Sequence, residues 1–424
     1  MTRAPGPKGT LIWGSLGAMK QDALGFLSQA AATHGDVVRL RFGPVIAHLL
    51  NHPDHIDHVL SRGAAGYDKT TRSVAQIKAT CGASLLSSDG ASWQRHRRLI
   101  QPMFQPRFLE TIGPVVDSAL DAMLDRWAIA ARRAQPIDIV TEMMQVMITT
   151  SVRFLFSSEV DHARIERPLG VLLADTWRRI EALFDPSTLS PVFHRAAFKT
   201  ARAEIDKLVF AVIRARRISG DRPDDLLSRL LCAHECEGTD RLTDQELRDA
   251  AVTLILAGHE TVANALAWAF ILLAQNPQWR GFDPQKIWFE TLRLYPSIWI
   301  MERRAVMPDT IGGYQIGKGS SILMSPYVLH RNPNFWPDPT RFDPARFDAP
   351  QVAARPRHAY LPYGLGPHRC IGLHLANRVA DRILSRVQAM FRLDVVAGEN
   401  ITIMPGITLR HAGAVRMTIA PPIG

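Results

Sequence analysis

A glycine-rich loop near the C-terminal end carries the side chain with the most distinctive chemistry. The loop covers residues 362–372, and Cys370 stands directly before residues with helical spacing. A thiol at the start of a helix is pushed towards thiolate by the helix dipole and by free amide groups. Glycines on both sides of Cys370 let backbone or a flat cofactor come close. The alternative for such a lone cysteine is a glycine-rich turn around a buried, inert thiol.

A second group of polar side chains lies inside the longest apolar stretch, residues 250–274. Glu260 and Thr261 are adjacent there, beside Gly258, which weakens the helix locally and leaves room for a small molecule or water. Burying two polar groups without a purpose is costly. A zinc-protease pattern would need a histidine at position 263, where Ala263 stands. A satisfied structural carboxylate remains the alternative interpretation of Glu260.

Two further pairs have spacings that place both members on one helical face. Glu290 and Arg293 are three residues apart, and Pro296 ends their helix soon afterwards. Trp93 and Arg97 are four residues apart. Alone, each pair is typical of a solvated surface helix, where ion pairs contribute little to stability.

Taken in their order along the chain, from the Trp93 pair to the Cys370 loop, the four motifs resemble those of the cytochrome P-450 superfamily. The resemblance implies that Cys370 is the proximal iron ligand of haem b (iron protoporphyrin IX), and that Tyr363, Gly364 and Gly372 shape the loop around it. It also implies that Ala257 and Gly258 open a groove for oxygen in the central helix. Thr261 would then hydrogen-bond to the activated oxygen, and Glu260 would relay protons through water.

The same resemblance assigns residues that hold the haem propionates and a structural core. The propionates would be held by Trp93, His96, Arg97, Arg303 and His368. The structural core would be Glu290, Arg293 and Arg346.

The sequence departs from the family pattern at several positions. Tyr363 stands where phenylalanine is usual, and Ala345 replaces the usual glutamate before Arg346. Between Pro277 and Glu290, about a dozen residues replace the few dozen that the family usually spends on two further helices. We therefore expect the surface around the cysteine loop to differ from that of typical members.

The predicted pocket is poor in charge, so the expected substrate is a largely apolar small molecule such as a terpenoid, carotenoid, fatty-acyl or polyketide-like skeleton. Its candidate lining residues are Leu254, Val262, Ile298, Trp299 and Ile300. By resemblance, the enzyme would insert one atom of O2 into this substrate. Electrons would come from NAD(P)H through an acidic ferredoxin or flavodoxin and its reductase, steered by basic residues: Arg95, Arg98, Arg355, Arg357 and Arg369. The alternatives are a haem-thiolate enzyme that does not insert oxygen and a non-catalytic haem carrier.

Composition narrows the class of protein. The chain has 424 residues, of which 46% are hydrophobic and 21% charged, a balance that excludes a disordered or collagenous protein. The net charge of +10 makes nucleic-acid binding a rival, but no basic arm or zinc-finger spacing accompanies it, and we expect no nucleic-acid partner. Four cysteines cannot form a disulfide framework for this length, and Cys232 and Cys236 have no second ligand cluster.

The expected fold is mainly α with small β-sheets. The resemblance implies the cytochrome P-450 fold, a single triangular-prism-like domain over residues 1–424 with haem between the central helix and the cysteine loop. Helical spacing dominates residues 92–286, whereas residues 303–323 and 401–419 alternate like short strands. Nothing at the N-terminus resembles a signal peptide, and ionisable groups interrupt the longest apolar stretch. We therefore expect a monomeric cytoplasmic protein without a membrane span.

Overall fold

The computed structural model describes residues 2–105, 109–157, 163–182, 195–235 and 242–421. It divides into two compact units. Unit 1 combines Met1–Val74 with Phe289–Cys370, and unit 2 combines Ala75–Trp288 with Ile371–Gly424. Helices dominate and the sheets are small, which confirms the predicted fold class.

Unit 1 is built around a five-stranded sheet with the order β1-β2-β8-β5-β3. The β2–β8 pair is parallel, and the other neighbouring pairs are antiparallel. The strands of this sheet are β1 (Val37–Phe42), β2 (Val45–Leu50), β3 (Tyr67–Asp68), β5 (Met301–Ala305) and β8 (Ser321–Met324). A second, two-stranded sheet pairs β6 (Asp309–Ile311) with β7 (Tyr314–Ile316).

Short helices surround this sheet. Those lying wholly in unit 1 are α1 (Leu16–Gln21), α2 (Ala23–His34), α3 (Pro53–Asp57), η1 (His58–Arg62), η2 (Ala64–Gly66), α14 (Pro326–Leu329), η7 (Pro344–Phe347) and α15 (Ala349–Ala354). Apolar side chains from the strands and from η1 form the core, with Leu365 of the cysteine loop packed against it. The cysteine loop is therefore packed against the core of unit 1.

Unit 2 is the helical part of the chain. Its helices are α5 (Gly90–Ile100), η3 (Gln101–Phe104), α7 (Ile112–Arg132), α8 (Ile139–Phe156), α9 (Ala163–Glu181), α10 (Ala196–Ser219), α11 (Leu226–Glu235), α12 (Asp244–Gln275), η6 (Pro277–Trp279) and α16 (Leu373–Met390). Two helices cross the unit boundaries, α4 (Arg72–Cys81) and α13 (Pro284–Leu294). Two small sheets complete it, β4 (Ile137–Asp138) with β12 (Arg416–Ala420) and β9 (Arg392–Val395), and β10 (Ile403–Pro405) with β11 (Leu409–His411).

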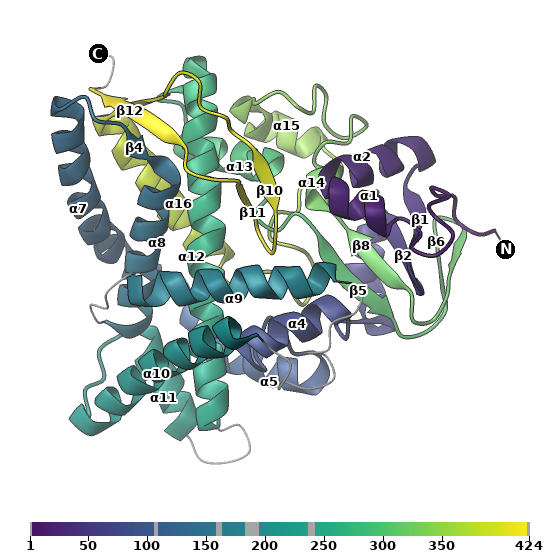
Figure 1. The fold of residues 1–424 in the computed structure, drawn as a ribbon, viewed down its shortest axis with the longest axis horizontal. Helices are drawn as coiled ribbons and strands as arrows, with labels where there is room; N and C mark the ends of the chain where they lie inside the picture. The colour runs from purple at the N-terminus through teal and green to yellow at the C-terminus, as the bar shows by residue number, and fades with distance from the viewer. Residues whose placement is uncertain (1, 106–108, 158–162, 183–194, 236–241, 422–424) are drawn as a thin grey trace. The chain divides into compact units, whose positions relative to one another are not determined.

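Helix α12 forms the axis of unit 2, with α8 packed beside it (Figure 1). It begins with a capping box, in which the Thr243 and Glu246 side chains each bond the other's backbone N–H. The most apolar 18-residue windows of α8 and α12 have mean hydropathies of 1.2 and 1.3 and are 61% and 83% buried. By length and composition both could cross a membrane, but such burial is also what core helices of a folded protein show.

Candidate active site

The cysteine loop of unit 1 folds back on itself before α16 begins. The Cys370 N–H donates to the Tyr363 carbonyl over 2.9 Å, which closes the loop. Gly364 and Gly366 have φ angles of 69° and 70°, a region that favours glycine. A Cβ at Gly366 would lie 1.8 Å from the Leu60 carbonyl oxygen, so only glycine lets the loop approach η1 this closely. The Cys370 side chain is exposed, and so a metal can reach its thiol.

A buried histidine fixes the start of this loop. His330 Nε2 accepts the Leu361 N–H over 3.0 Å, which leaves Nδ1 to donate to the Arg293 carbonyl at 3.2 Å. Burial, together with the nearby Arg293 charge, lowers the pKa of His330 to about 3. A neutral imidazole therefore links the loop to the end of α13 at all physiological pH values.

Glu290 and Arg293 form a fully buried ion pair at the C-terminal end of α13. Arg293 Nε and Nη2 donate to the two Glu290 carboxylate oxygens over 2.6 and 2.8 Å. Three backbone carbonyls take its remaining hydrogen bonds, those of His330, Pro339 and Arg341. Arg346 lies 3.5 Å from Glu290, as the predicted third member. The three residues meet within unit 1 and tie α13 to the segment before the cysteine loop.

Helix α12 of unit 2 is buried along nearly its whole length. From Leu247 to Leu273, every residue is buried except Ala257, Gly258 and Thr261. Ala257 is exposed and the other two are half-buried. Residues at positions i and i+4 share a helical face, so Ala257 and Thr261 form one accessible spot. A Cβ at Gly258 would lie 3.5 Å from Ser151 Oγ of α8, which is an ordinary van der Waals contact, so an alanine would also fit there.

Glu260 and Thr261 face different surroundings although they are adjacent in sequence. Thr261 Oγ1 donates to the Ala257 carbonyl over 2.7 Å. Glu260 is buried, and its Oε1 accepts a 2.8 Å hydrogen bond from Thr408 Oγ1 in the turn between β10 and β11. Burial raises the pKa of the Glu260 carboxyl, opposed by the weaker effects of the Thr408 hydrogen bond and the Arg410 charge.

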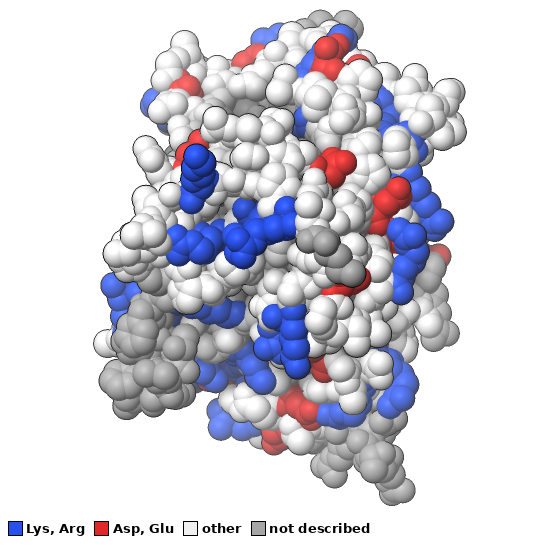
Figure 2. Space-filling model, turned by 90° about the vertical axis from the view of Figure 1, so that its right-hand side faces the viewer, with Lys and Arg blue, Asp and Glu red and all other residues white. Residues whose placement is uncertain are grey.

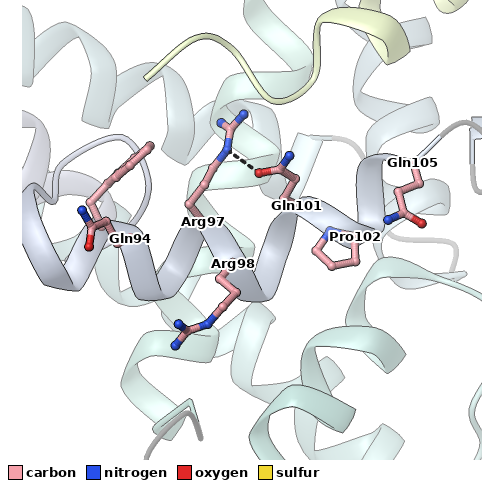
Figure 3. Close-up of a pocket in the computed structure, with 7 residues that line it drawn as sticks. Gln94, Arg97, Arg98, Gln101, Pro102 and Gln105 are labelled. Atoms are coloured by element: carbon pink, nitrogen blue, oxygen red, sulfur yellow. Dashed lines mark hydrogen bonds between the residues drawn. The ribbon is translucent and has the colours of Figure 1, made fainter. Parts of the chain in front are cut away.

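The predicted propionate residues on α5 separate into two environments. Trp93 and Arg97 line an open pocket of about 480 Å³, where Arg97 Nε donates to Gln101 Oε1 over 3.2 Å (Figure 3). Arg98 also lines it and points to the other side of the helix (Figure 3). Guanidinium and amide donors of this kind suit a carboxylate.

His96 is held by a residue that the sequence analysis did not single out. It is buried, and its Nε2 lies 3.1 Å from Glu246 Oε1 at the start of α12. Arg95, predicted to attract a redox partner, also pairs with Glu246. The net pKa of Glu246 is lowered: burial raises it, but hydrogen bonds from Thr243 and His96 and the Arg95 charge outweigh that effect.

The other predicted cofactor residues belong to unit 1 or to the start of α16. Arg303 on β5 and His368 in the loop are half-buried, and Arg303 Nη1 donates to the Glu302 carbonyl. Gly372 is the N-cap residue of α16. Because Arg303 and His368 lie in unit 1 whereas Trp93 and Arg97 lie in unit 2, the propionate assignment stays a prediction.

The candidate substrate residues differ in exposure. Trp299 is 0% exposed, so its side chain is not accessible to a substrate. Ile298 and Ile300 beside it are half-buried, whereas Leu254 and Val262 on α12 are 9% and 6% exposed. Cys81 ends α4 and is fully buried. Cys236 lies outside the described residues, and no cluster of three metal-binding side chains occurs in the described ranges.

A family model described as cytochrome P450 matches residues 4–280 and 285–414. The interruption falls in the segment that is shorter than the family pattern, where the structure has only η6 before α13. The chain belongs to the cytochrome P450 family. It is a P450 monooxygenase, an oxidoreductase that uses haem, O2 and electrons derived from NAD(P)H.

Several relatives cover nearly the whole P450 chain. Cyclooctatin synthase of Streptomyces melanosporofaciens is 33% identical over 99% of this chain and 95% of its own. Pentalenene oxygenase of Streptomyces avermitilis is 28% identical over 97% and 96%. Among solved structures, the heme domain of cytochrome P450DA matches with a TM-score of 0.88 at 21% identity, covering 100% of this chain and 98% of that one, a likeness of fold.

The residues of this P450 fit a flat cofactor that carries a metal. In unit 1, an exposed thiol stands on a loop whose glycines keep side chains away from it. In unit 2, the accessible spot of α12 consists of the small residue Ala257 and the hydroxyl of Thr261, and Gly258 beside them is half-buried. A thiolate suits haem iron, and small side chains suit the close approach of a planar ring and oxygen.

Three residues that support the site were not predicted from the sequence. The signal for Glu246 was present, since threonine followed three residues later by glutamate is a capping box. The hydrogen bond between His330 and Leu361 joins positions 31 residues apart and depends on the fold. Thr408 lies 148 residues from Glu260, and no local pattern connects them.

Proposed function

We propose that this P450 monooxygenase binds haem through Cys370 and inserts oxygen into a terpenoid-like hydrocarbon skeleton. The observation that carries the site assignment is the pair of features described above, an exposed thiol on a glycine loop and one accessible spot on a buried helix. The bound haem supplies the activation of O2. The chain's residues supply the ligand, the protons and the exclusion of water.

In this proposal, Thr261 and Glu260 divide the handling of protons. The Thr261 hydroxyl donates to the Ala257 carbonyl. Its oxygen lone pairs can still accept a hydrogen bond, because a hydroxyl has one donor and two acceptor sites. Glu260, whose pKa is raised by burial, can hold a proton near neutral pH and pass it on through water.

Replacing the hydroxyl tests this role. Thr261→Val should reduce the product formed per NAD(P)H consumed by at least tenfold, with the missing electrons recovered as peroxide or water. Thr149→Val, in which the lost hydroxyl bonds the Gln145 carbonyl of α8, is the matched control and should stay coupled. Full coupling in Thr261→Val would contradict the role assigned to this hydroxyl.

The relatives support the substrate class. Their names include cyclooctatin synthase, cyclooctat-9-en-7-ol 5-monooxygenase and pentalenene oxygenase, and they modify terpenoids. A cyclic terpene has few polar groups, which agrees with the apolar character of Leu254, Val262, Ile298 and Ile300. Titration with cyclic terpene hydrocarbons should produce a low-spin to high-spin shift at lower concentration than fatty acids of equal carbon number. Tighter binding of the fatty acids would overturn this choice.

We infer that the electron donor is a small acidic ferredoxin or flavodoxin served by its own reductase. Basic side chains are spread over the face drawn in Figure 2, in keeping with the net charge of +10. Of the five predicted arginines, Arg98, Arg357 and Arg369 are exposed. Arg95 is engaged by Glu246, and Arg355 stacks on the Trp336 ring at 3.9 Å. Each of the three exposed arginines is therefore accessible to an acidic partner.

Electrostatic steering predicts two measurable effects on the rate of reduction. Raising the ionic strength should slow reduction by the acidic partner. Arg357→Glu should slow reduction more than Arg133→Glu, which makes the same change in net charge at the end of α7. A reduction rate independent of salt would refute the steering. The accompanying proposal of a monomeric cytoplasmic enzyme is tested by its sedimentation and by its recovery from the soluble fraction.

A further inference from the structure

One face of α12 is occupied by polar and aromatic side chains at four-residue intervals. Glu260, Asn264 and Trp268 stand at i, i+4 and i+8, and all three are buried. The β10–β11 hairpin packs along this face (Figure 1). Thr408 bonds Glu260, and His411 stacks on Trp268 with ring centroids 3.9 Å apart. The hairpin is thus registered against the helix at two places.

The hydroxyl of Thr408 is the centre of a short chain of hydrogen bonds. Asn264 Nδ2 lies 3.4 Å from Thr408 Oγ1, and Thr408 Oγ1 lies 2.8 Å from Glu260 Oε1. An amide nitrogen can only donate, so the threonine oxygen accepts from Asn264 and gives its own proton to the carboxylate. This chain suits an ionised Glu260, because it directs a proton towards it.

Reversing the chain suits the protonated acid. A protonated Glu260 would donate to Thr408, and Thr408 would then donate to the Asn264 amide oxygen, which has no hydrogen-bond partner among the described residues. Both protonation states of the carboxyl can therefore be accommodated at the same place by rotating one hydroxyl and one amide. Such a pair of arrangements is what a residue that repeatedly gains and loses a proton requires.

We propose that Thr408 is a positioning residue for Glu260, which holds the carboxyl towards the β10–β11 hairpin and sets how readily it takes up and releases protons. The proposal rests on the proposed role of Glu260 in proton delivery. Thr408 acts through Glu260.

Few charged groups surround this carboxyl. Arg410 of β11 contributes a positive charge nearby. His259 on α12 and His411 on β11 are buried, and burial lowers the pKa of each to about 4, so both are neutral at pH 7. The neighbouring helix α8 places Ser151 beside Gly258 of α12, and a serine hydroxyl does not titrate near neutral pH. The Thr408 hydroxyl is therefore the main hydrogen-bonding support of the carboxylate among the described residues.

The Thr408→Val substitution removes the hydroxyl and keeps the shape of the side chain. A hydrogen bond to a charged group is a strong one, so the carboxyl should titrate about one to two pH units higher in this variant. The titration is read from the infrared band of the protonated carboxyl, identified as the band lost in Glu260→Gln. Thr408→Ser should restore the wild-type value. Thr402→Val, whose lost hydroxyl contacts Asn400 at the surface, is the matched control and should leave it unchanged.

The pH dependence of coupling, measured as product per NAD(P)H in the holoenzyme, should move in the same direction in Thr408→Val. A purely structural threonine would lower stability without moving either midpoint. An unchanged infrared titration, or a shifted titration with an unmoved coupling profile, would overturn the positioning role. Full coupling of Glu260→Gln at every pH would instead overturn the proposed role of Glu260 itself, which keeps the two failures distinguishable.

Discussion

Replacing Arg293 by lysine measures how strongly the buried ion pair holds unit 1 together. Arg293 makes five hydrogen bonds with N···O distances of 2.6–3.0 Å, two to Glu290 and three to backbone carbonyls. Lysine keeps the charge, but its three donors radiate from one nitrogen and cannot reproduce the planar fork. At least two buried acceptors lose their donor, at about 1–3 kcal/mol each. We expect Arg293→Lys to lower the free energy of unfolding by about 2–6 kcal/mol.

The same change at Arg346 provides the control. Its Nε lies 3.5 Å from Glu290, and its Nη2 donates to the Asp338 carbonyl, so Arg346→Lys should cost less than about 1 kcal/mol. Both are measured by urea unfolding of the holoprotein, followed by far-ultraviolet circular dichroism. Equal losses for the two variants, or a loss below about 1 kcal/mol for Arg293→Lys, would refute the idea that the five-bond fork carries the stability.

Two other predictions concern the loop and the pH range. Gly366→Ala should sharply reduce the haem bound per chain, because its Cβ would meet the Leu60 carbonyl; Gly313→Ala, at a similar φ of 81° with open space around it, should retain haem. Stability should fall between pH 6.5 and pH 4, because histidines kept neutral by burial in the folded state gain protons on unfolding. These histidines are His48, His259, His330 and His411. Urea unfolding at pH 7 and pH 5 measures this loss of stability, which should be smaller in His411→Phe because this variant takes up one proton fewer on unfolding. Equal stability of the wild-type protein at the two pH values would contradict the prediction.

The features that the sequence predicted depend on local spacing. The glycine loop around Cys370 and the ion pair of Glu290 and Arg293 are each encoded within a dozen or so residues. The buried central helix is recognised from the helical periodicity of its own segment. Their geometry follows from helical periodicity and from the conformations that only glycine adopts. The structure confirms a mainly helical fold and brings Arg346 to Glu290 as expected.

What the sequence could not reveal depends on contacts between distant segments. Arg95 looked like a surface charge, but the start of α12 supplies Glu246 to pair with it, 151 residues away. Adjacent positions suggested that Glu260 and Thr261 act as a unit, whereas the helix turns one towards Thr408 and the other towards the accessible spot. Which side of a helix meets which hairpin is decided by packing, and packing leaves no local pattern in the sequence.

The central claim is that Cys370 is the axial ligand of the haem iron. It is tested most directly by the difference spectrum of the dithionite-reduced protein with and without carbon monoxide, recorded for wild type, Cys370→Ala and Cys232→Ala. Cys232 is also an exposed free cysteine and serves as the matched control. The account predicts a red-shifted Soret band in wild type and Cys232→Ala that is lost in Cys370→Ala. A band typical of histidine ligation in wild type, or an unchanged band in Cys370→Ala, would contradict it.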